Sequence, residues 1–446
     1  MEYKKLADKI FKQGKDRFED MEVYVEKTKT IEIAIFNGEI DKYNISDTEG
    51  LSLRGIHDDK MGYSYTEKVD ESSIDMLIEE AYENGKHIDA LEKEIIFSGS
   101  DEYKELDNFS KELKETSLED KIEFTKALEK EALELDPRII AVSYCMYDEI
   151  ENSKYLINTK GLNLEDRGNL AYAFIMVVAK EGEDTKTGSS YIISKDFSEF
   201  DYKKLAREAV EEALSLLGAK PIKSQEYPVV FRNDIFADLL GAFQSIFYAE
   251  SVQKGLSLLK DKIDEPIATK KFTLIDDPFV EGGFNSSPFD GEGTATYCKK
   301  IIDEGVLKTY LYNWKTARKD GVKSTGNGYR DSYKSSITTS TTNLYVKEGD
   351  KSLEEIFQTM DSGVYITDLQ GLHSGLNPVS GDYSLSAHGY EIENGKIKRP
   401  INQITIAGNF FETLMDIEEI GKDLRFSMNG VASPSIKVKK LAISGE

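Results

Sequence analysis

The chain has 446 residues, 39% of them hydrophobic, and its 82 acidic against 57 basic side chains give a formal net charge of -25. This length exceeds one ordinary hydrophobic core, so two domains are expected. The negative charge disfavours direct binding to nucleic acid or anionic lipid, because both are negatively charged and no basic run stands out. No stretch approaches the roughly 18 apolar residues of a membrane span, and residues 1–20 lack the apolar core of a signal peptide, so we expect a cytoplasmic protein.

The first half of the chain is predicted to combine helices with an antiparallel sheet. Apolar residues at helical spacing predict an opening helix that ends at Gly14. Alternating apolar and polar residues then predict strands, and Asn37-Gly38 favours a type I′ turn, so residues 31–43 are predicted as a hairpin. A helix ends at Gly85, and another begins at the N-cap Ser117. Further strands are expected at 50–56, 60–65, 139–147, 154–158, 162–179 and 189–194, and a further helix at 202–217.

A boundary is expected between Gly218 and Tyr227, where both periodicities break, which predicts an N-terminal α/β domain at 1–220 and a second domain at 226–446. A helical stretch at 234–259 opens the second domain. Beyond residue 270 the sequence favours strands and turns, with helices only at 353–360 and 410–420. The predicted fold class is therefore α+β, with a mostly β domain around a central helix.

Histidine is scarce, with only four residues, and no two of them stand within five positions of each other. A zinc peptidase needs two histidines on one helix face with a carboxylate nearby, as in H-E-x-x-H. His57 and His87 are interpreted as surface residues. His373 and His388, with Asp382 and Glu391, could approach one another if two strands pair; His373, His388 and Glu391 are the alternative metal ligands, against an interpretation as polar loop residues lining a cleft.

The run Ser335–Asn343 is rich in hydroxyl groups and has high β-propensity. It suits a strand that lines a polar groove, or equally a solvent-facing edge strand. No nucleophile motif is present, and residue types alone assemble no catalytic site. Cys145 and Cys298 are interpreted as buried free thiols. The candidate residues of a peptide cleft are Ser336, Thr338, Ser340, His373, Ser374 and Asp382.

Several blocks of the sequence resemble the TldD/PmbA family, the bacterial and archaeal zinc peptidases once named modulators of DNA gyrase. The blocks include Ser287-Pro-Phe-Asp-Gly-Glu-Gly293, Asn377-Pro-Val-Ser-Gly-Asp-Tyr383, Gly389-Tyr-Glu-Ile-Glu-Asn-Gly395 and Ile404-Thr-Ile-Ala-Gly-Asn409. With the hairpin around Asn37-Gly38, the resemblance spans most of the chain.

The resemblance implies one of two branches. One branch carries H-E-x-x-x-H in the central helix and a cysteine ligand near the C-terminus, whereas the PmbA or TldE branch lacks both and assembles with the first. Here the matching segment Leu239–Glu250 has no histidine, and Phe426–Pro434 has no cysteine. Zinc finds no donor atom on the side chains of Gly241, Ala242, Phe243 and Ile246. The side chains of Gln244 and Ser245 are poor substitutes for its usual ligands. The chain thus resembles the PmbA/TldE branch.

This resemblance implies a strongly bent C-terminal sheet around the central helix and assembly with a TldD-type zinc peptidase subunit. That partner would hold the zinc and hydrolyse small unstructured peptides, while this chain would contribute no catalytic residue, metal ligand or cofactor of its own. We also expect that the chain alone can form a homo-oligomer. Two alternatives stay open, an autonomous metallopeptidase with atypical ligands and a regulatory binding protein of the gyrase-modulator type, so the sequence leaves undecided whether the chain is itself an enzyme.

Overall fold

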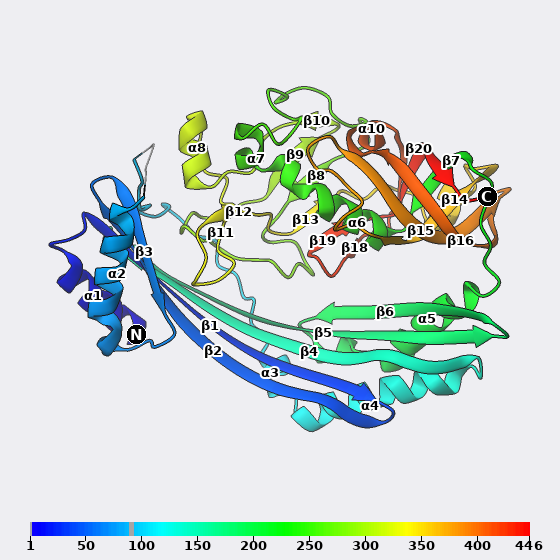
Figure 1. Cartoon of the computed structure of the whole chain (residues 1–446), viewed down its shortest axis with the longest axis horizontal. Coiled ribbons are helices and arrows are strands. Elements are labelled where there is room, and N and C mark those ends of the chain that lie inside the picture. Colours follow the sequence, from blue (N-terminus) through cyan, green and yellow to red (C-terminus); the bar gives the residue numbers. More distant parts are fainter. Residues whose placement is uncertain (1, 89–92) are drawn as a thin grey trace.

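The computed structural model describes residues 2–88 and 93–446 and has an α+β fold in two parts (Figure 1). The elements of the first part are α1 (Glu2–Gly14), β1 (Asp20–Phe36), β2 (Glu39–His57), β3 (Lys60–Thr66), η1 (Glu71–Ser73), α2 (Ile74–Lys86), α3 (Lys111–Glu115), α4 (Leu118–Leu135), β4 (Ile139–Asn158), β5 (Asn163–Glu181), β6 (Asp184–Ser194), η2 (Phe197–Glu199) and α5 (Tyr202–Ser215).

These strands form one sheet of order β3-β2-β1-β4-β5-β6, in which all neighbours are antiparallel. The predicted hairpin turn is confirmed, because Asn37 and Gly38 both adopt positive φ, 53° and 78°. The prediction of two separate strands at 139–147 and 154–158 is wrong, because both belong to β4, which is continuous over 20 residues. The polar residues between them face a neighbouring strand on each side, so pairing holds them extended.

The two faces of this sheet have different neighbours. Helices α1 and α2 pack on one end of it, on side chains such as Val23 and Leu51. Helices α4 and α5 pack on the other end, around Tyr147 and Ile175. These four strand residues, one each from β1, β2, β4 and β5, all have odd numbers. Because successive side chains of a strand point to opposite faces, the even-numbered side chains of β1 and β4 point to the other face, toward the second part of the chain. Figure 1 shows the long strands sweeping beneath that second part.

The second part is mostly β structure. It contains β7 (Gln225–Phe231), α6 (Asn233–Phe243), η3 (Gln244–Phe247), α7 (Ala249–Gln253), β8 (Leu274–Asp276), β9 (Lys299–Asp303), β10 (Val306–Leu307), α8 (Trp314–Asp320), β11 (Gly328–Tyr329), β12 (Thr338–Thr339), β13 (Leu344–Val346), α9 (Leu353–Phe357), β14 (Ser362–Gln370), β15 (Asp382–Glu393), β16 (Lys396–Asn409), α10 (Phe410–Met415), β17 (Ile417–Ile420), β18 (Arg425–Phe426), β19 (Val431–Ser433) and β20 (Ile436–Ser444).

Two six-stranded sheets surround the helix α6, as expected. Their orders are β10-β9-β8-β13-β19-β18 and β16-β15-β14-β7-β20-β17. An additional pairing of β16 with β20 bends the second sheet into a closed ring of five strands. The side chains of Phe236, Leu239, Leu240 and Phe243 on α6 are fully buried in the main core. Close packing of these side chains therefore fixes the helix on its buried face before any ligand is considered.

Two predicted helices of the second part are interrupted by backbone pairing with another segment. The helix expected at 234–259 stops at Phe243, continues as a short 3-10 turn and restarts at Ala249, because the backbone around Tyr248 pairs with Leu311. The helix expected at 410–420 ends at Met415, and Ile417–Ile420 instead pairs with β20 as a strand. In both cases a tertiary backbone pairing overrides local helical propensity.

The hydroxyl-rich run 335–343 also contains less strand than expected, only Thr338–Thr339 in β12. Hydrogen bonds to side chains hold the rest of the run: Thr342 donates its backbone N–H to Asp276, and the carbonyl of Ser340 accepts from Asn327. Such bonds offer the backbone an alternative to a sheet.

Cys145 is buried as predicted, but Cys298 is exposed where it precedes β9, so that prediction is wrong. Within the described ranges, no helix is long and apolar enough to cross a membrane.

Candidate functional site

A cavity of about 610 Å³ lies between the sheet of the first part and the loops of the second. Its floor includes the even-numbered residues Ile150, Asn152, Lys154 and Leu156 of β4, which the strand's alternation places on one face. The opposite wall comes from widely separated segments of the second part: Gln244, Phe284–Ser287, Gly326–Asp331, Ser340–Thr342 and Asn429. Hydroxyl, carboxamide and backbone groups thus surround a space of the size that small ligands occupy.

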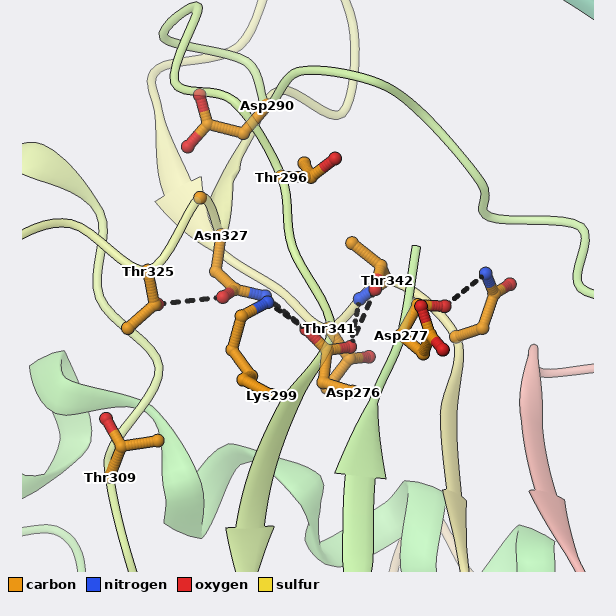
Figure 2. A network of polar contacts seen from close by, with 12 residues as sticks. Asp276, Asp277, Asp290, Thr296, Lys299, Thr309, Thr325, Asn327, Thr341 and Thr342 are labelled. Carbon is orange, nitrogen blue, oxygen red and sulfur yellow. Dashed lines mark hydrogen bonds and ion pairs between the residues drawn. The ribbon is translucent and has the colours of Figure 1, made fainter. Parts of the chain in front are cut away.

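A buried polar network fixes one wall of the cavity (Figure 2). Asp276, at the end of β8, is fully buried. Its Oδ2 accepts hydrogen bonds from Lys299 Nζ and Asn327 Nδ2, both at 2.9 Å. Its Oδ1 accepts from the backbone N–H and the hydroxyl of Thr342, at 2.6 and 2.9 Å. Because four donors converge on one carboxylate, the segment 340–342 is held in place without being part of a long strand.

The acidic turn in the block Ser287–Gly293 is a second buried structure beside the cavity. Asp290 accepts hydrogen bonds from the backbone N–H groups of Glu292, Thr294 and Gly328. Glu292 accepts one from the N–H of Trp314 at 2.8 Å. Burial raises the pKa of both carboxyl groups, and Asp290 raises the pKa of Glu292 further. A Cβ at position 328 would lie 2.7 Å from Glu292 Oε2 and 3.0 Å from Asp290 Oδ2, so a side chain there would displace these carboxylates.

A charge cluster joins the floor of the cavity to its opposite wall. Glu22 of β1 is fully buried and pairs with Arg54 of β2, at 2.8 Å, and with Arg330 of the second part. Arg330 also donates to the carbonyl of Gly291 at 2.7 Å and lies over the ring of Tyr24. Since a buried carboxylate is costly without its cations, this cluster favours one fixed arrangement of the two parts.

The end of the central helix faces the cavity with amides and a hydroxyl group. Thr341 donates its hydroxyl to Gln244 Oε1 at 2.8 Å. Asn429 donates to Asp238 Oδ1 at 3.2 Å, and a Cβ built on Gly241 would lie 2.5 Å from Asn429 Nδ2. The Asn429 amide therefore occupies the space that a side chain at position 241 would need. Burial raises the pKa of Asp238 to about 6, an effect that Ser427 opposes by donating a hydrogen bond.

These groups do not fit a zinc ion. Zinc sites use imidazole, thiolate or carboxylate donors, almost always four in a structural site and three plus water in a catalytic one. At the helix end the donors are carboxamides and a hydroxyl group, with Asp238 as the carboxylate. Across residues 2–88 and 93–446, no three histidine, cysteine or carboxylate side chains form a group that could hold a metal.

The structure brings only one of the six predicted cleft residues to the cavity, namely Ser340. Ser336 and Thr338 are exposed and do not line it. His373 and Ser374 lie in an exposed turn after β14. Asp382, at the start of β15, accepts hydrogen bonds from Ser380 and Asn409 instead.

The alternative metal ligands His373, His388 and Glu391 also form no metal group among the described residues. His388 Nδ1 lies 3.3 Å from Asp368 Oδ2. Glu391 is bound by Lys398 and Arg399.

The comparisons with known proteins agree with this architecture. Three family models match successive segments: PmbA/TldA metallopeptidase domain 1 at 21–85, the central domain at 111–217 and the C-terminal domain at 224–445. An uncharacterized protein of Methanocaldococcus jannaschii is 30% identical, over 97% of this chain and 98% of its own length. The chain therefore belongs to the PmbA/TldD metallopeptidase family.

Relatives of this chain have been named PmbA, TldE and modulator of DNA gyrase. The metalloprotease PmbA of Escherichia coli O157:H7 is 26% identical over 95% of this chain and 92% of its own length. Among solved structures, a putative modulator of a DNA gyrase from Thermotoga maritima has a TM-score of 0.93 at 33% identity, and TldE from Thermococcus kodakarensis a TM-score of 0.92 at 26% identity. Each comparison covers 99% of this chain and 100% of the other.

Proposed function

We propose that this chain is the PmbA/TldE-type subunit of a cytoplasmic metallopeptidase complex and binds no catalytic metal itself. One observation carries the proposal: at the central helix, Gly241 packs against the amide of Asn429, and among the residues that the structure describes no imidazole or thiolate joins Asp238 in a group that could hold a metal. The likeness to a protein named TldE supports the same assignment.

In this proposal the zinc belongs to a TldD-type partner, where it activates water for the hydrolysis of small unstructured peptides. This chain completes the chamber in which the peptides are held. Its cavity of about 610 Å³ would admit a short extended chain but no folded domain. The hydroxyl and amide groups of Ser340, Thr341 and Asn152 suit a peptide backbone, whose groups are the same in every sequence.

The first experiment measures zinc in the purified chain. We expect far less than one zinc per chain after exposure to zinc and desalting, and no hydrolysis of short peptides such as tetra-alanine. Mixing with a TldD-type chain from the same organism should give a stable complex and peptide hydrolysis. A partner in which both histidines of its H-E-x-x-x-H helix are replaced by alanine is the matched control.

Two results would contradict the proposal. Stoichiometric zinc with hydrolysis by the isolated chain would favour the autonomous metallopeptidase. Failure of the chain to associate with any TldD-type chain of the host would refute the proposed complex.

A second experiment tests the cavity in the assembled complex. Thr341→Ala and Ser340→Ala shorten two side chains at the cavity wall and should change the rate of peptide turnover or the preferred peptide length. Ser336→Ala, on an exposed residue outside the cavity, is the control. Unchanged turnover in the first two variants would count against peptide binding here.

A further inference from the structure

One corner of the cavity floor carries two lysines beside a single aspartate. Lys154 of β4 donates to Ser287 Oγ at 2.7 Å and lies 3.3 Å from Asp166 Oδ2, its partner across the strand pair. Lys195 follows β6 and lines the same cavity. Asp166 also interacts electrostatically with Lys195. The Asp166 carboxylate is therefore shared between the ammonium groups of Lys154 and Lys195.

Lys195 differs from Lys154 in its direct partner. Its Nζ donates to Asn108 Oδ1 at 3.2 Å, a neutral acceptor. Within the described part of the chain, no carboxylate lies within ion-pair distance of it. Asp107 is near enough to act on it electrostatically, but its side chain is exposed and accepts from the backbone N–H of Phe109. A half-buried ammonium without an ionic partner is costly, and an anion supplied by a ligand would remove that cost.

Of the other carboxylates that line the cavity, those of Glu26 and Asp290 are held by hydrogen bonds, whereas Asp331 is exposed and lies beside the Tyr329 hydroxyl. Glu26 accepts hydrogen bonds from Asn152 Nδ2 at 3.3 Å and from the backbone N–H of Tyr333 at 3.0 Å. Asp290 is held by three backbone N–H groups, as described above. Neither is therefore free to move and neutralise Lys195.

Apolar surface lies next to this lysine. Ile150 is 37% exposed although it lines the cavity, and it stands opposite Leu170 in the sheet register. Ser194 pairs with Ala171, so Lys195 follows at the level of Leu170. A ligand whose carboxylate binds Lys195 would place its neighbouring atoms over Ile150 and Leu170.

We propose that this corner binds the free α-carboxylate of a short peptide, with Lys195 as the carboxylate anchor and Ile150 and Leu170 as the surface for an apolar last side chain. The choice of a peptide rests on the proposed function, whereas the carboxylate preference follows from the charges of the corner itself. A peptide that crossed the cavity without ending there would bring no charge to Lys195. The anchor thus favours substrates or products with a free C-terminus at this position.

The test uses three synthetic peptides and the full-length chain. Binding of Ac-Ala-Ala-Leu with a free carboxylate, of its C-terminal amide and of Ac-Ala-Ala-Gly with a free carboxylate is measured by calorimetry. The variants are Lys195→Met, which removes the charge, and Lys195→Arg, which keeps it. Lys29→Met is the matched control, because Lys29 is an exposed lysine on the odd-numbered face of β1. Thermal unfolding of each variant confirms that it is folded.

We expect the native chain to bind the leucine acid at least about tenfold more tightly than the amide, the effect of one charge-assisted hydrogen bond. The glycine acid should bind more weakly than the leucine acid. Lys195→Met should abolish the preference for acid over amide, Lys195→Arg should restore most of it, and Lys29→Met should leave it unchanged.

Equal binding of acid and amide by the native chain, an undiminished preference in Lys195→Met, or no binding of any peptide at millimolar concentration would overturn the anchor. The zinc and partner measurements are separate, so the accessory-subunit proposal can stand when the anchor fails. Conversely, stoichiometric zinc in the isolated chain would refute that proposal while leaving an acid-specific site intact.

Discussion

Replacing Asp276 by alanine should destabilise the second part of the chain strongly. The carboxylate is fully buried, and Lys299, its partner at 2.9 Å, has only 4% of its side chain exposed. Removing one partner of a buried ion pair leaves the other charge uncompensated, which costs about 3–5 kcal/mol. The donors on Asn327 and Thr342 also lose their acceptor, so we expect the upper end of this range.

The assay is chemical denaturation followed by tryptophan fluorescence. The chain has one tryptophan, Trp314, whose indole N–H donates to Thr294 beside the cavity, so it reports on the second part. The control is Glu250→Ala on α7, which breaks the exposed pair with the C-cap residue Lys254 and should cost no more than about 0.5 kcal/mol.

The double variant Asp276→Ala/Lys299→Met should be more stable than Asp276→Ala alone, because it removes the stranded ammonium. If Asp276→Ala shifts the unfolding midpoint no more than Glu250→Ala does, the reasoning from burial is refuted.

Three further predictions concern other buried groups. The pKa of Glu292 is raised in the folded state, so the folded chain binds this proton more tightly than the unfolded chain, and stability should fall as pH rises above the ordinary pKa of 4.5. Glu292→Gln should therefore make the melting temperature depend less on pH between 5 and 8. The same pH dependence in the native chain and the variant would contradict this prediction. Gly241→Ala should gain about 1 kcal/mol from helix propensity only in an Asn429→Ala background, since the native amide blocks the new methyl group; equal effects in both backgrounds would show that no such contact matters. Glu22→Gln leaves two arginines without their shared carboxylate and should lower stability by about 3–5 kcal/mol, and a melting temperature equal to that of the native chain would exclude the proposed charge cluster.

Local signals in the sequence predicted the elements whose conformation depends on near neighbours. Asn37-Gly38 predicted its turn because both residues accept positive φ, and the structure confirms it. Ser117 predicted a helix start, and its side chain does accept the N–H of Asp120. The periodicity of the sequence predicted the α+β class and the mostly β domain around a central helix, and the resemblance to the family added the strong bend of the C-terminal sheet.

The cavity could not be predicted in the same way. Lys195 and Gln244 are ordinary polar residues in sequence, and only the packing of the sheet against the loops brings them to one space. The glycine-rich segment with His373 was predicted to line a cleft because histidine is scarce in this sequence, yet its turn does not line the cavity. The break after Phe243 was missed for a similar reason, since its cause is a backbone pairing with Leu311, far along the chain.

The closed ring has a consequence for biosynthesis. Strand β7 begins at Gln225, yet both β7 and β16 pair with β20, which ends at Ser444. The sheet of the first part, by contrast, draws all its strands from residues 20–194 and needs no strand that is made later. On the ribosome the first part can therefore fold early, while more than two hundred following residues wait with unpaired strand edges until the last strand emerges, a period in which chaperones would protect them.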